Sequence, residues 1–193
     1  MNRAPLLLAL SLLLACRPDD VAGDDSGLPG DGGASTTDGG SAGDGGANTG
    51  DGGSASADCA GSSLVGSWLS QGSDVSELFQ ATPFEYDRID ASFTEGCDYT
   101  VLATSSGGDE YTITGTWTAD AGTSPATIVQ HQDQPYTATA QGIWRVDSDT
   151  LSFEVVQTDP DYGFTPPTPS AGFGSTSGQG IAAGSNVQTY RRN

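Results

Sequence analysis

Few residues of this 193-residue chain have the types and spacing that catalysis needs. His131 is the only histidine, and a general base needs a positioned partner that the neighbouring sequence does not supply. The pairs Asp147/Asp149 and Asp159/Asp161 have the spacing of paired hydrolase carboxylates, but Asp is common in turns because it binds nearby backbone N–H groups. We therefore expect a solvated histidine, turn aspartates and no enzyme.

Two further sequence patterns match functional motifs but lack the neighbouring residues that those motifs need. Residues 39–43 match GxSxG, yet a nucleophile elbow needs a strand before it and a helix after it. Asp-Gly-Gly recurs at Asp31, Asp38, Asp44 and Asp51, but calcium-binding repeats have a nine-residue period and an apolar core residue. These repeats are six or seven residues apart and lack the apolar position, so we expect no calcium site.

Residues 1–15 have the features of a lipoprotein signal peptide. A positively charged start precedes an apolar run over residues 4–15, too short for a bilayer core, which needs about 20 residues. Leu13-Leu14-Ala15-Cys16 resembles a lipobox, which implies cleavage before Cys16 and acylation of that cysteine. Arg17 follows where an Asp favours inner-membrane retention, so the resemblance implies the outer membrane of a Gram-negative bacterium.

If Cys16 carries lipid, two cysteines remain. Cys59 and Cys97 allow one pairing in an oxidising compartment, and closing that loop stabilises a fold by about 4 kcal/mol in the chain-entropy model. A metal pair is the rival interpretation, but the chain has no CxxC motif and a single histidine. We expect a disulfide, no metal and no cofactor.

The charge of the chain excludes one class of partner. Its formal net charge is −19, it contains no lysine, and all six basic residues are arginines. Such a chain is repelled by phosphate backbones and anionic headgroups. We expect no nucleic-acid partner, and attachment to the membrane by lipid rather than by charge.

The composition changes near residue 59. Residues 17–58 are mostly Gly, Asp, Ser, Ala and Thr without aromatic side chains, so they cannot bury enough surface to offset the entropy of ordering. We expect the lipidated Cys16 and a disordered Gly/Asp-rich linker over 16–58, then one domain over 59–193, which is long enough for a single core.

The domain alternates with period two. In residues 110–119, apolar or small side chains at odd positions alternate with threonines, which is typical of strands with one buried face. Short turns between such runs favour antiparallel neighbours. We predict about eight strands near 64–70, 86–94, 98–104, 110–119, 125–131, 136–146, 150–158 and 185–192. An all-β up-and-down meander of eight strands closes into a barrel, which removes its sheet edges.

Each of the three tryptophans follows a glycine by two residues. The units are Gly66-Ser67-Trp68, Gly115-Thr116-Trp117 and Gly142-Ile143-Trp144. Glycine within a strand marks a kink or a close approach, and kinks let a sheet curve into a barrel. The first unit, together with Arg191 or Arg192 near the C-terminus, resembles the lipocalin-like (calycin) domains of bacteria. This resemblance implies a barrel whose bottom is closed by one arginine packed over Trp68.

One long connection has no regular pattern. Residues 159–184 contain Tyr162, Phe164 and Phe173 among prolines, then turn to Gly and Ser. Loops of this length are uncommon in compact domains and are often functional. The rings form either a lid over one barrel end or a plug against the barrel or its outer wall, and we favour the second because three rings expose much apolar area.

Two functions follow from these patterns. The first is a membrane-anchored module that binds a small, partly apolar ligand inside the barrel, where Gly115, Ala138, Ala140 and Gly142 leave volume. The second is a non-catalytic structural or interaction protein of the envelope with a filled barrel. A cavity of about 300 Å³ or more favours the first function.

Overall fold

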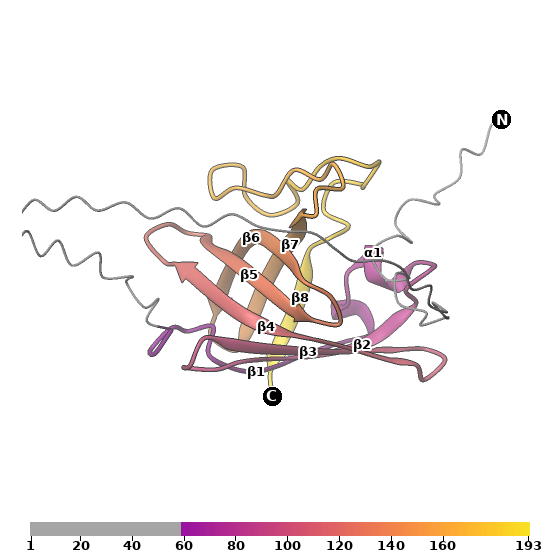
Figure 1. Cartoon of the computed structure of the whole chain (residues 1–193), viewed down its shortest axis with the longest axis horizontal. Coiled ribbons are helices and arrows are strands. Elements are labelled where there is room, and N and C mark those ends of the chain that lie inside the picture. Colours follow the sequence, from indigo (N-terminus) through magenta and orange to yellow (C-terminus); the bar gives the residue numbers. More distant parts are fainter. Residues whose placement is uncertain (1–58) are drawn as a thin grey trace, which may run out of the picture. The chain divides into compact units, whose positions relative to one another are not determined.

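A computed structural model describes residues 59–193 of the protein, and in it eight antiparallel strands close into a barrel (Figure 1). The signal peptide, Cys16 and the linker that the sequence predicts lie outside the described residues. Each strand pairs with the next along the chain, and β1 pairs with β8 through Trp68 opposite Arg192. The strands are β1 Gly66–Gln71, β2 Tyr86–Phe93, β3 Asp98–Ser105, β4 Glu110–Asp120, β5 Ala126–Gln134, β6 Ala138–Asp147, β7 Thr150–Asp159 and β8 Gln188–Arg192. The predicted all-β meander barrel is confirmed, and its layout is consistent with a lipocalin-like fold.

The first and last strands are shorter than the sequence predicts. The Val65 amide donates to Ser62 in a turn at 3.0 Å, so β1 begins only at Gly66. Ser185 accepts from Leu78, and the Asn186 side chain donates to Val155 at 2.8 Å, so β8 begins at Gln188. Residues that are held in these turn and loop hydrogen bonds do not pair with a neighbouring strand, so the sheet begins after them.

The connection between β1 and β2 carries the two short helices, η2 Gly72–Asp74 and α1 Glu77–Gln80. It is held at the end of the barrel away from Arg192 by a buried network. The side-chain oxygen of Gln188 accepts from the Ser76 backbone amide at 2.9 Å, and its side-chain nitrogen donates to the Ser70 hydroxyl. Val75 is consequently buried in the core.

The half of the barrel that contains Trp68 is filled by aromatic rings. Phe93 lies at their centre, with its ring centroid 5.7 Å from that of Trp117, 5.9 Å from Phe153 and 6.2 Å from Tyr99. Tyr190 continues the cluster at 6.3 Å from Phe153. Edge-on, tilted and stacked ring pairs of this kind add to the stability gained from burial.

The glycines of the second and third Gly-x-Trp units allow close approach of backbones. A Cβ at Gly115 would overlap the carbonyl oxygen of His131, and one at Gly142 would overlap that of Glu154. The expectation that these two glycines leave interior volume is therefore wrong. Their missing side chains make room for the backbone of the adjacent strand.

Residues 160–187 pack on the outside of the barrel. Glu154 points away from the interior, opposite in phase to its buried neighbour Phe153, yet it is only 1% exposed. Its carboxylate accepts from the amides of Gly174 at 2.6 Å and Thr176 at 2.9 Å. Figure 1 shows this segment lying alongside β6 and β7. We call residues 160–187 the outer segment.

Candidate ligand-binding site

The end of the barrel near Trp68 is closed by contacts between the two ends of the domain. The Arg192 guanidinium carbon lies 4.2 Å from the Trp68 ring centroid, and its nitrogens donate to the carbonyls of Val65 and Ser63. The Trp68 indole donates to Leu64 at 2.8 Å. Of the two arginines that the resemblance offers, Arg192 is thus the one over the ring.

Arg191 points the other way, as expected for its neighbour on a strand. It donates to Thr150 at 2.9 Å and forms an ion pair with Asp74 at 3.2 Å. That ion pair raises the pKa of the Arg191 guanidinium. Arg191 therefore connects β8 to β7 and to the helix η2 on the outside of the barrel, and it does not contact Trp68.

The first residues of the domain lie across this closed end. Cys59 and Cys97 form a disulfide, with their Cα atoms 5.4 Å apart, and Cys97 lies in the turn between β2 and β3. The Cys59 sulfur is 3.6 Å from the Trp117 carbonyl oxygen, and because it is oxidised it has no proton to donate there. Residues 59–63, which we call the N-terminal segment, are thereby held against β4.

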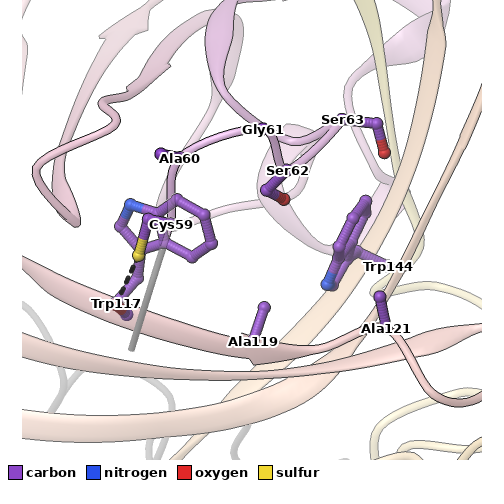
Figure 2. A pocket seen from close by; sticks show the side chains of 9 residues that line it. All are labelled: Cys59, Ala60, Gly61, Ser62, Ser63, Trp117, Ala119, Ala121 and Trp144. Atoms are coloured by element: carbon purple, nitrogen blue, oxygen red, sulfur yellow. Dashed lines mark hydrogen bonds between the residues drawn. The ribbon is translucent and has the colours of Figure 1, made fainter. Parts of the chain in front are cut away.

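A pocket of about 390 Å³ opens between this N-terminal segment and the barrel. Figure 2 shows Trp117 and Trp144 on opposite sides of it, with Ala119 between them and Ala121 next to Trp144. The N-terminal segment supplies the remaining wall. None of its nine lining residues is ionisable, apart from Cys59, which is in the disulfide: Cys59, Ala60, Gly61, Ser62, Ser63, Trp117, Ala119, Ala121 and Trp144.

Beyond the aromatic cluster the interior is lined by other side chains, which begin at Gln130, the cross-strand partner of Trp117. Gln130 on β5, Ala140 on β6 and Gln157 on β7 are paired across adjacent strands, and all three point inward, in phase with Ile128, Trp144 and Phe153. The two glutamines are 6% and 7% exposed. A row of two amides around one small side chain is a polar patch within the barrel.

The Gln157 amide is held in place by two hydrogen bonds. Gln157 donates to the Pro160 carbonyl at 3.2 Å and accepts from the Tyr136 hydroxyl at 3.5 Å. Burial raises the pKa of that Tyr136 hydroxyl, which keeps it protonated as a donor. Gln130 is 6% exposed and presents its amide to the same part of the interior, and a ligand that hydrogen-bonds to a buried amide gains favourable energy.

Apolar side chains near this patch are not fully packed. Val101, Ile113, Ala140 and Val155 point inward, in phase with buried residues of their strands, but each keeps part of its surface accessible. Inward side chains of a closed barrel remain accessible only where the interior is hollow or open. We call this region, with Gln130 and Gln157, the upper interior.

The residues considered for catalysis are not brought together. His131 lies within β5, not at its end, because the strand continues to Gln134, and its exposed ring is 3.3 Å from the Thr139 hydroxyl. The Asp161 carboxylate accepts from the Gly163 amide, as expected of a turn aspartate. Across residues 59–193, no group of three or more His, Cys, Asp or Glu side chains could hold a metal ion.

The aromatic residues of the outer segment occupy different places. Phe173 lies under Arg145, with the guanidinium carbon 5.6 Å from the ring centroid, on the outer side of β6. The Tyr162 carbonyl accepts from Gln179 within the segment. Phe164 is half-buried beside the bridge between Thr165 and Ser177. For Phe173, the structure shows packing against the outer wall.

Comparisons of the chain with protein-family models, curated proteins and solved structures found no match. In the described part of the chain, no helix is both long and apolar enough to cross a membrane. The class of the domain therefore rests on its fold, a closed eight-stranded antiparallel barrel.

Proposed function

We propose that the protein is a lipid-anchored envelope protein that binds a small, partly apolar molecule in the upper interior of a lipocalin-like barrel. Cys16, behind a lipoprotein signal peptide, carries the anchor and holds the domain at the outer membrane through the linker. The protein is not an enzyme in this proposal. It binds its ligand without nucleic acid, metal or cofactor.

One observation carries the binding proposal, namely the two inward-pointing amides of Gln130 and Gln157 among partly accessible apolar side chains. Binding sites for small molecules are mostly apolar with a few convergent polar groups that orient the ligand. Val101, Ile113 and Val155 supply the apolar surface, and Gln130 supplies a donor and an acceptor. A ligand with one polar group on an apolar body fits this combination.

A second function is favoured by the aromatic cluster around Phe93. Rings fill the half of the barrel near Trp68, as in a structural or interaction protein whose barrel has no ligand. The two proposals differ in whether the upper interior binds a ligand. If the protein is a structural protein with a filled barrel, no ligand binds there.

Binding of N-phenyl-1-naphthylamine separates the two proposals. This neutral probe has an apolar body and one N–H donor. Its binding is measured by fluorescence energy transfer from the tryptophans of the barrel to the bound probe. Ala140→Phe places a ring between Gln130 and Gln157 and should abolish binding. Thr139→Phe is the matched control, because the adjacent residue points outward and should leave binding unchanged. Equal binding to both variants, or none to the parent protein, contradicts the proposal.

The anchor has its own test. Cys16→Ser should give a soluble precursor that is uncut or cut elsewhere, because the acylated residue is gone. Detergent partitioning and the mature mass measure this. If the variant still enters the detergent phase with an unchanged mass, the lipid anchor is wrong.

A further inference from the structure

We propose that the pocket between Trp117, Trp144 and the N-terminal segment is a second ligand site, specific for an uncharged, flat, ring-containing molecule that carries a hydrogen-bond acceptor. This site lies at the closed end of the barrel and shares no lining residue with the upper interior. Its volume of about 390 Å³ is within the range of small-molecule sites.

The absence of charge in the lining selects an uncharged ligand. No carboxylate or guanidinium is among the nine lining residues. An ion that leaves water for such a pocket loses hydration without gaining a counter-charge, which is strongly unfavourable. The many carboxylates elsewhere on this acidic chain add repulsion against anions.

The two indoles select the shape of the ligand. Trp117 and Trp144 are 1% and 4% exposed, so their positions are fixed by the core and not by the ligand. The Trp144 indole donates to the Thr127 carbonyl at 3.2 Å, which holds that ring in place. Figure 2 shows the small side chain of Ala119 between the two rings and that of Ala121 beside Trp144, so no large side chain separates the indoles. A flat ring that enters between them stacks on an indole.

The indole N–H of Trp117 is a donor without a partner in the described part of the chain, which favours a ligand that carries an acceptor. The buried Nε1 atom of Trp117 has no hydrogen-bond partner within residues 59–193. In Figure 2 this nitrogen is on the side of the ring toward Ala60, an exposed residue of the N-terminal segment that lines the pocket. A small displacement of Ala60 lets a ligand oxygen reach the indole N–H, and satisfying a buried donor is favourable.

The disulfide makes this site depend on oxidation. Cys59 begins the N-terminal segment, and its bond to Cys97 holds that wall of the pocket against β4. The Trp117 amide also donates to the Cys97 carbonyl at 2.8 Å, so the same turn contacts both the indole-bearing strand and the wall. Reduction releases one wall and should weaken binding, while both indoles stay in the core.

The test uses the full chain labelled with fluorotryptophan in lipid nanodiscs, observed by fluorine NMR and titrated with coumarin. Coumarin is flat and uncharged and has a carbonyl acceptor. The resonances of Trp117 and Trp144, assigned with single Trp→Phe variants, should shift with saturation while that of Trp68 stays in place. Coumarin-3-carboxylate should bind at least about tenfold more weakly because its charge has no partner in the pocket.

Three variants control the titration. Ala121→Leu fills the pocket from an exposed turn and should abolish the shifts, whereas Ala183→Leu, at an exposed position of the outer segment, should leave them unchanged. Replacing both cysteines, Cys59→Ser with Cys97→Ser, should weaken coumarin binding. The proposal is overturned if Ala121→Leu binds like the parent, if the carboxylate binds as well as coumarin, or if all three tryptophans shift together. The probe and the blocking variant differ from those of the upper interior, so either site can fail alone.

Discussion

The Arg192 guanidinium lies over Trp68, with its carbon 4.2 Å from the ring centroid, and so joins the last strand of the barrel to the first. The same group donates to two backbone carbonyls of residues 63–65, which cross the closed end. One side chain therefore holds three parts of the domain together. Trp68 beneath it is 1% exposed.

This contact predicts a specific coupling. Trp68→Ala should lower the free energy of unfolding by about 3–5 kcal/mol through the cavity left in the core. A double-mutant cycle should give about 0.5–2 kcal/mol of coupling between Trp68 and Arg192, the range of cation–π pairs. Arg191 should show none, since it pairs with Asp74. Urea denaturation measures the stability of all the variants. Coupling between Trp68 and Arg191 would contradict the assignment of Arg192 to the position over the ring.

Gly66 is predicted to be irreplaceable for the same reason. Its φ is +140°, and a Cβ there would lie 2.6 Å from an Arg192 nitrogen. Gly66→Ala should therefore both strain the backbone, by about 1–3 kcal/mol, and displace the guanidinium. The variant should be less stable than the parent, and combining it with Arg192→Ala should recover part of the loss. An unchanged denaturation midpoint for Gly66→Ala would contradict the geometry.

Glu154 is predicted to hold the outer segment on the barrel. Its buried carboxylate accepts two backbone N–H groups, and Glu154→Gln replaces one acceptor oxygen with a donor. Losing a hydrogen bond to a charged group costs about 1.5–3 kcal/mol. Limited proteolysis should then cut within 160–187 faster than in the parent. Glu110→Gln, at an exposed position, is the control, and equal cleavage of both variants would show that Glu154 does not hold the segment.

Four buried or half-buried tyrosines predict how stability depends on alkaline pH. Burial raises the pKa of Tyr86, Tyr99, Tyr136 and Tyr190, with the negative charge of Asp133 contributing at Tyr99. Folding thus favours the neutral phenol. This contribution to stability is complete below the ordinary tyrosine pKa of about 10 and is lost as the pH rises toward the folded values. Phenolate absorbance should appear together with unfolding; full ionisation of a folded barrel would refute the burial of these hydroxyls.

Much of the fold could be predicted because strand alternation is a local property. All eight strands and their order follow from period-two runs and short turns, and the pairing of Trp68 with an arginine follows from the family resemblance. The starts of β1 and β8 were less predictable, since they depend on irregular or distant contacts. The Val65 amide donates to the Ser62 carbonyl in a turn, and the Asn186 side chain donates to the Val155 carbonyl.

The candidate sites were harder to predict, because they depend on which strands become neighbours. The alternation Ala126, Ile128, Gln130 already places a glutamine on an apolar face, which is the one signal of the upper interior. Nothing in the sequence near Gln130 indicates that Gln157 lies two strands away from it across Ala140. The pocket at the closed end likewise requires the N-terminal segment to cross the barrel beside Trp117.

Native mass spectrometry of the mature protein, purified from its own envelope, tests the central proposal most directly. We expect a bound small molecule on the parent and on Thr139→Phe, and its loss on Ala140→Phe, because only the latter side chain enters the upper interior. A parent protein that carries no added mass, or an Ala140→Phe variant that keeps the same added mass, would contradict a ligand in the upper interior and favour a filled barrel.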